Sequence, residues 1–155
     1  MSTQIESDKV YTIMEAAKLS GLPESTLRYY ETIGLIDRIK RGETSKQREY
    51  ADDDINMIIA VACLSATGMS IDSMREYLGN RARGASAAKD QINLLDKQRT
   101  RLLEEAHFMQ LRQRYVDVKI DYWKAVEAGD KPKIAEMKKQ ADSIASELKL
   151  PKENK

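Results

Sequence analysis

The chain has 155 residues, of which 41% are hydrophobic and 33% charged, with only 7 glycines and 3 prolines. This composition favours helices and excludes a β-sandwich, a collagen-like chain and a disordered tail. The single cysteine excludes an internal disulfide, a zinc finger of several thiolates and an iron–sulfur cluster. The sequence also shows no secretory signal and no apolar run long enough to span a membrane. We therefore expect a cytoplasmic protein with no membrane partner.

The charge is unevenly distributed, although the net charge of the chain is only +1. Residues 1–80 carry a net charge of −4, whereas the rest of the chain carries +5. Between residues 38 and 48, five bases accompany one acid, Glu43. A local basic patch can bind phosphates, because salt screens charges beyond about 8–10 Å. The alternative for this stretch is a solvated loop.

Two short helices are predicted at about 13–33, after a flexible leader at 1–9. Gly21 stands where the first helix should end, and Pro23 stands at the start of the second. Two short helices joined by a tight glycine turn are typical of a helix-turn-helix. The apolar residues expected to close its small core are Ile13, Ala17, Leu22 and Leu27.

A wing is predicted at about 36–50, where two short β-prone runs flank a polar segment. We expect a two-stranded hairpin with the bases at its tip. Residues 10–80 are therefore interpreted as one winged helix-turn-helix domain.

Two further helices complete this domain. Asp52, Asp53 and Asp54 precede a largely apolar helix at 55–67, and negative charge is favourable at a helix start. A metal site is the less favoured interpretation of these acids, and we expect no metal. Ser70 is expected to cap a fourth helix at 71–78.

Residues 85–128 contain neither glycine nor proline and predict one helix about 66 Å long. Two stripes repeat every seven residues along it. The first stripe is Leu95, Leu102, Met109 and Val116, and the second is Ile92, Arg99, Ala106, Gln113 and Ile120. This pattern predicts a dimerising coiled coil in which polar residues of the second stripe fix the register. The alternative is a lone solvent-bridging helix.

Residues 129–155 are expected to form a short C-terminal helix and a tail. Three aromatic residues near the end of the long helix are interpreted as dimer core, or alternatively as the lining of a small pocket between subunits. They are Tyr115, Tyr122 and Trp123.

A helix-turn-helix, a basic wing and a dimerising coiled coil together are typical of proteins that read duplex DNA at two half-sites. Arg28 is expected to reach a guanine edge or a phosphate, and Tyr29 either donates to a phosphate or packs in the core. Tyr30 is expected in the core, and Tyr50 is expected to brace the second strand of the wing. The candidate DNA-binding residues are Ser25, Thr26, Arg28, Tyr29, Lys46, Arg48 and Tyr50.

Several short motifs between residues 10 and 80 carry a family resemblance. They are YTI at 11–13, SGL at 20–22, TLRYYE at 26–31, IGLI at 33–36, Arg48-x-Tyr50 and GMSI at 68–71. In this order they resemble the opening of MerR-family transcription regulators. The resemblance implies a mainly α fold, with a winged helix-turn-helix DNA-binding domain followed by a long antiparallel coiled-coil dimerisation helix. It also implies a homodimer that binds a pseudo-palindromic promoter and distorts its overlong spacer, with RNA polymerase as a further partner.

The segment around Cys63 resembles the aldehyde- and thiol-stress-responsive NmlR/AdhR subgroup of that family. This resemblance makes Cys63 a candidate thiol sensor in a stress response. The bases that accompany the cysteine in the subgroup are replaced here by Ala62 and Ser65. A buried, inert cysteine is therefore the alternative. The cysteines of the metal-sensing members have no counterpart in this chain, so we expect no cofactor.

No enzymatic activity is predicted. The chain lacks a phosphate-binding glycine loop, and its one histidine, His107, has no orienting partner that would make a catalytic pair with Cys63. The favoured hypothesis is a dimeric transcription regulator that distorts promoter DNA. The alternatives are a coiled-coil interaction or scaffold protein and a MerR-like architectural protein that bends DNA.

Overall fold

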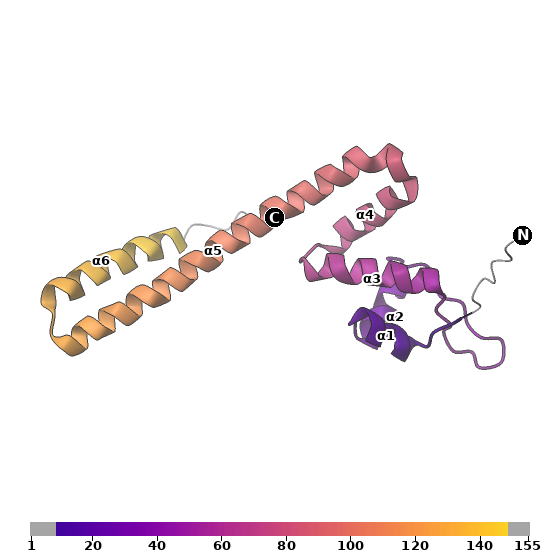
Figure 1. Cartoon of the computed structure of the whole chain (residues 1–155), viewed down its shortest axis with the longest axis horizontal. Helices are drawn as coiled ribbons and strands as arrows, with labels where there is room; N and C mark the ends of the chain where they lie inside the picture. The colour runs from indigo at the N-terminus through magenta and orange to yellow at the C-terminus, as the bar shows by residue number, and fades with distance from the viewer. Residues whose placement is uncertain (1–8, 149–155) are drawn as a thin grey trace, which may run out of the picture. The chain divides into compact units, whose positions relative to one another are not determined.

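The structure, a computed structural model, describes residues 9–148. All of the expected leader except Lys9, and the end of the expected tail, lie outside these residues. The chain divides into two compact units, Met1–Leu95 and Asp96–Lys155. Its fold is mainly helical, which confirms the fold class predicted from the sequence (Figure 1).

The first unit is built from short helices and the beginning of a long one. In chain order they are α1 (Ile13–Ser20), α2 (Glu24–Thr32), α3 (Asp52–Ala66), α4 (Ile71–Arg83), the 3-10 turn η1 (Gly84–Ala87) and the start of α5 (Ala88–Ala128).

Local capping explains where α1 begins and ends and where α4 begins. Thr12 accepts from the backbone N–H of Glu15 at 3.1 Å, and the Glu15 carboxylate accepts in return from Thr12 N–H at 3.1 Å. Gly21 ends α1 with φ +75°, a left-handed conformation that favours glycine. Ser70 caps α4 by accepting from Ser73 N–H at 3.2 Å, as its position in the sequence predicted.

The core of the first unit lies between α1, α2, α3, α4 and the loop that follows α2. Leu27 and Tyr50 are completely buried in it, and Tyr30 is 7% exposed, which confirms the prediction that Tyr30 is a core residue. The other apolar residues predicted to close the helix-turn-helix core pack partly buried against this cluster. They are Ile13, Ala17 and Leu22.

The wing forms fewer strand contacts than predicted. Among the described residues, its pairing is the isolated bridge between Arg41 and Arg48 rather than a ladder of two strands. The first β-prone run gives its backbone donors to α2 instead. The N–H groups of Leu35 and Ile36 bond to the carbonyl of Tyr30, at 2.9 and 3.3 Å, so these groups cannot pair with an opposite strand.

The start of α3 and the end of α4 also differ from prediction. α3 begins at Asp52, three residues earlier than expected, where the Asp54 carboxylate accepts from the N–H of Ala51 at 2.9 Å. α4 continues to Arg83, five residues beyond the predicted end.

In the second unit, α6 (Lys131–Leu148) runs back along the end of α5 after a turn at Gly129 (Figure 1). Four buried residues form the core of this helical pair: Val118, Met137, Ala141 and Ile144. Tyr115 and Tyr122 pack, partly buried, on this cluster within the same chain. Trp123 is 62% exposed.

The predicted coiled-coil seam lies on another face of α5. Its apolar residues are exposed in the single chain: Ile92, Leu95, Leu102, Met109, Val116 and Ile120. A helix with such an apolar stripe needs a partner to bury it. Among the described residues, no helix is both long and apolar enough to cross a membrane.

Candidate nucleic-acid interface

Two residues of the predicted recognition helix, α2, project outward. Tyr29 is 52% exposed, and the Arg28 side chain is half exposed beside Glu24, with 3.6 Å between the nearest atoms of the two charged groups. An exposed ion pair of this kind contributes little to stability, so Arg28 can exchange it for a phosphate or a base edge. Ser25 is exposed and Thr26 is half-buried at the start of the same helix.

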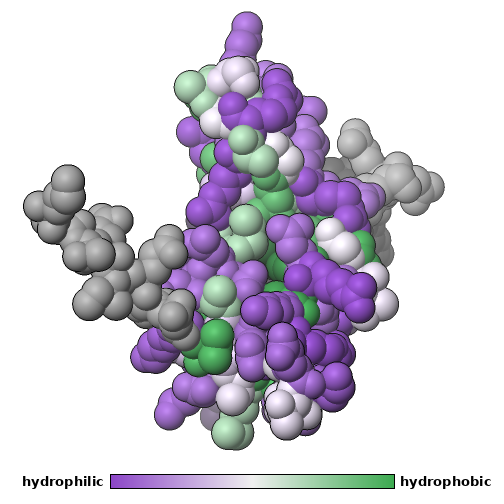
Figure 2. Space-filling view, turned by 90° about the vertical axis from the view of Figure 1, so that its right-hand side faces the viewer, coloured by the Kyte–Doolittle hydropathy of each residue, from purple (hydrophilic) through white to green (hydrophobic). Residues whose placement is uncertain are grey.

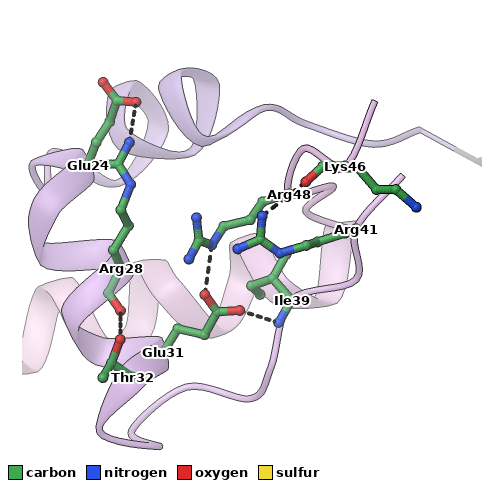
Figure 3. A network of polar contacts seen from close by, with 8 residues as sticks. All are labelled: Glu24, Arg28, Glu31, Thr32, Ile39, Arg41, Lys46 and Arg48. Carbon is green, nitrogen blue, oxygen red and sulfur yellow. Dashed lines mark hydrogen bonds and ion pairs between the residues drawn. The ribbon is translucent and has the colours of Figure 1, made fainter. Parts of the chain in front are cut away.

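The tip of the wing exposes Lys46 in a left-handed conformation, with φ +58°. Arg41 holds this turn by donating from Nη1 to the Lys46 carbonyl at 3.0 Å (Figure 3). Gly42 lies close to this turn, where a Cβ would meet Ser45 Oγ at 2.5 Å and Glu49 Oε1 at 2.6 Å, so a larger residue there would displace these two side chains. The tip is thus an ordered turn that presents a lysine to solvent.

A single carboxylate joins α2 to both sides of the wing. Glu31 Oε1 accepts from the backbone N–H of Ile39 at 2.8 Å, and Oε2 accepts from Arg48 Nε at 2.7 Å (Figure 3). The Glu31 and Arg48 side chains are 12% and 20% exposed. Burial by itself raises the pKa of Glu31, but the hydrogen bonds from Ile39 and Arg48 and the charges of Arg48 and Arg41 together lower it below the ordinary value of 4.5.

The end of α2 is also tied to α4. Arg75 donates from Nη2 to the carbonyl of Ile33 at 3.0 Å, which satisfies a carbonyl at the C-terminal end of the recognition helix. The recognition helix is therefore held from the wing and from α4.

Tyr50 lies in the core rather than on the surface. Its side chain is completely buried, and its hydroxyl has no hydrogen-bond partner among the described residues. Burial raises its pKa above the ordinary value of 10.0. The side chain of Tyr50 therefore offers no surface for a direct contact with DNA, and its bracing role stays a prediction.

Sequence reasoning did not identify Glu31 or Arg75 as parts of this site. Each acts on a group far away in the sequence: Arg75 reaches back 42 residues to Ile33, and Glu31 reaches forward 17 residues to Arg48. Neither pairing has a periodic signature. The available signal was the position of Glu31 within the TLRYYE motif, beside the candidate DNA contacts.

Cys63 lies on α3 and its side chain is exposed. The alternative interpretation of Cys63 as a buried hydrophobe does not fit the single chain. The described residues contain no group of three or more His, Cys, Asp or Glu side chains placed to hold a metal ion.

One side of the molecule presents mainly polar side chains (Figure 2). Figure 2 shows one side of the chain as mostly hydrophilic, with hydrophobic residues in small separate patches. Such a surface suits a hydrated, charged ligand better than an apolar one.

The fold of the first unit and the tethering of its wing to α2 define a winged helix-turn-helix protein. A family model described as "MerR HTH family regulatory protein" matches residues 11–80. A solved structure of a putative MerR-family transcriptional regulator from Listeria monocytogenes is 30% identical, with a TM-score of 0.63, and the match covers 84% of this chain and 98% of that one. The chain belongs to the MerR family.

Curated relatives agree with this assignment. The HTH-type transcriptional regulator AdhR of Bacillus subtilis (strain 168) is 38% identical over 92 residues, which cover 59% of this chain and 65% of AdhR. The regulator YyaN of the same organism is 38% identical over 69 residues, 44% of this chain and 49% of YyaN. The chain thus spans about half to two thirds of the length of these relatives.

One further structure shares the fold. HiNmlR, a MerR-family regulator lacking the sensor domain and bound to promoter DNA, has a TM-score of 0.60 and 22% identity, with coverage of 77% of this chain and 94% of HiNmlR.

Proposed function

We propose that this protein is a transcription regulator that binds duplex promoter DNA. The proposal rests on three exposed side chains, Arg28 and Tyr29 on α2 and Lys46 at the tip of the wing. Glu31 holds the wing to α2. In this interpretation α2 enters the major groove, where Ser25, Thr26 and Arg28 contact bases or phosphates, while Tyr29 and Lys46 contact the backbone.

The relatives support this function. AdhR is named a transcriptional regulator, and HiNmlR, which has the same fold, is bound to promoter DNA in its crystal structure. Family members are regulators rather than enzymes, which supports the view that this chain is not an enzyme.

A homodimer is the second part of the proposal. The exposed apolar residues of the α5 seam recur along a helix of 41 residues, and a second copy in antiparallel orientation would bury them. Two copies would present two first units to the halves of a pseudo-palindromic operator. Distortion of the promoter spacer would then allow RNA polymerase to use it.

Titration of a labelled duplex from the DNA upstream of the protein's own gene, at salt concentrations from about 50 to 200 mM, tests DNA binding. Lys46→Ala should weaken binding and lower the salt slope by about one, because one phosphate contact is lost. Lys138→Ala, which removes an exposed lysine from α6, is the matched control and should leave both unchanged. Salt-independent binding, or none, would favour the scaffold alternative.

Transcription in vitro separates a regulator from an architectural protein. A regulator that acts through promoter distortion should change the output of purified RNA polymerase from the bound promoter. A protein that bends DNA for another purpose should bind the same fragment and leave transcription unchanged.

A sensing role for Cys63 is a second candidate function, and its exposure on α3 favours that role over an inert place in the core. A thiol on the surface is accessible to an electrophile or an oxidant. Promoter output should respond to an electrophile in the wild type and not in Cys63→Ser. An equal response in both proteins would remove Cys63 from the mechanism.

A further inference from the structure

We propose that Glu31 is a positioning residue for DNA binding, and that Arg48 serves as its partner in fastening the wing to α2 rather than as a phosphate ligand. This inference rests on the proposed function and assigns roles within the same site. The sequence suggested that Arg48 contacts DNA and gave Glu31 no role, whereas the structure assigns Arg48 to hold the wing and Glu31 to position it.

The contacts of Glu31 span the wing. Ile39 lies where the chain enters the wing, and Arg48 lies on the returning side, so one carboxylate holds both sides to one helix. The two bonds use different oxygens, at 2.8 and 2.7 Å, and both are charge-assisted. Beyond these contacts, Glu49 N–H donates to the Lys40 carbonyl at 2.8 Å and joins the two sides of the wing to each other.

The surroundings of Arg48 set it apart from the other bases of the site. Its side chain is 20% exposed and its Nε donor is committed to Glu31, whereas the Arg28 side chain is 50% exposed and Lys46 is exposed at the tip. Arg48 keeps the N–H donors of its two Nη atoms, but turning the guanidinium away from Glu31 to bind a phosphate with Nε as well would leave a partly buried carboxylate without its cation. Such a separation is costly, because the remaining charge loses its partner in a poorly hydrated place.

A negative charge close to DNA is unfavourable unless it serves another purpose. If Glu31 were merely an acid near the duplex, its removal would reduce repulsion from the phosphates and would also free Arg48 to bind them. Duplex binding would then become tighter. If Glu31 positions the wing, its removal releases the wing and binding becomes weaker. The two roles thus predict changes of opposite sign.

The test is the affinity of Glu31→Gln for the upstream duplex, measured where every variant is fully folded. Glutamine has the size of glutamate, but it carries no charge, and its single carbonyl oxygen cannot replace both carboxylate oxygens that accept from Ile39 and Arg48. We therefore expect binding about tenfold weaker, which corresponds to the loss of roughly one hydrogen bond. Glu43→Gln removes the same charge from the exposed wing tip and is the matched control. It should leave binding unchanged or slightly tighter.

A double-mutant cycle separates the two roles of Arg48. If Arg48 acts through Glu31, Arg48→Gln weakens binding in the wild type but adds no further loss to Glu31→Gln. If Arg48 binds phosphate by itself, removing it lowers the DNA affinity by the same factor in the wild type and in Glu31→Gln. That additive result, or tighter binding by Glu31→Gln, would overturn the inference.

Amide hydrogen exchange in the free protein tests the fastening without DNA. Exchange at Ile39 and Glu49 should be faster in Glu31→Gln, while core amides of α1 and α3 keep the wild-type rate. Unchanged exchange in the wing would overturn the inference even if the variant binds DNA poorly. A wild type that binds no duplex would instead overturn the proposed function, and with it the role of Glu31 in DNA binding.

Discussion

Asn80 on α4 donates a hydrogen bond from Nδ2 to Oε1 of Gln91, in the first turn of α5, at 3.1 Å. The Gln91 amide in turn donates from Nε2 to the carbonyl of Tyr77 at 3.0 Å, so it bridges a side chain and a backbone group of the same helix. Asn80 is 7% exposed. This pair of amides fixes the start of α5 against α4, and α5 carries the proposed dimer seam.

Gln91→Ala should lower the free energy of unfolding by about 1–3 kcal/mol, because it leaves the buried Asn80 amide without its partner. Urea unfolding monitored by circular dichroism measures this change. Gln110→Ala, at an exposed position of the same helix, is the control and should cost little. Equal costs for the two substitutions would show that the bridge contributes nothing.

Tyr50→Phe should leave stability unchanged or raise it by up to about 1 kcal/mol. The buried hydroxyl has no partner among the described residues, so its removal takes away a polar group that lost water on folding. Thermal unfolding at neutral pH measures the effect. Duplex affinity should not change, because a completely buried side chain offers no surface to DNA, and a clear loss of affinity would return Tyr50 to the set of direct contacts.

The stability of the first unit should depend on the protonation of Glu31. Its pKa in the folded protein is lowered below 4.5, so its contribution is fully present above the ordinary glutamate pKa and is lost as the pH falls through the folded value. The free energies of unfolding of the wild type and Glu31→Gln should therefore differ most near neutrality and converge in acid. A difference that stays constant as the pH falls through and below 4.5 would contradict this assignment.

Met109→Lys should disrupt the proposed dimer without unfolding the subunit. Met109 is 59% exposed in the single chain, and burial of a methionine in an interface is worth about 1.5–3 kcal/mol per copy. Sedimentation velocity should show a shift from dimer to monomer at micromolar concentration, with an unchanged helical spectrum. Gln110→Lys adds the same charge beside the seam and should remain dimeric.

The sequence predicted the helix-turn-helix because its signals are local. Gly21 and Ser70 determine where α1 ends and α4 begins through contacts within a few residues, and a seven-residue repeat marks the exposed seam of α5 wherever the helix lies. The wing was predicted less well. β-propensity indicates an extended backbone but does not identify the partner, and here Leu35 and Ile36 bond to α2.

The sequence by itself therefore determined the order of the helices, the caps at the start of α4 and the end of α1, the apolar seam and the family, since each depends on neighbours in the chain or on a motif of fixed spacing. Only the tertiary structure decided that Arg48 pairs with Glu31, that Tyr50 is buried and that Cys63 is exposed. These properties depend on which distant groups the fold brings together and which it leaves in water. Burial and charge pairing arise from packing in three dimensions, and no local pattern encodes them.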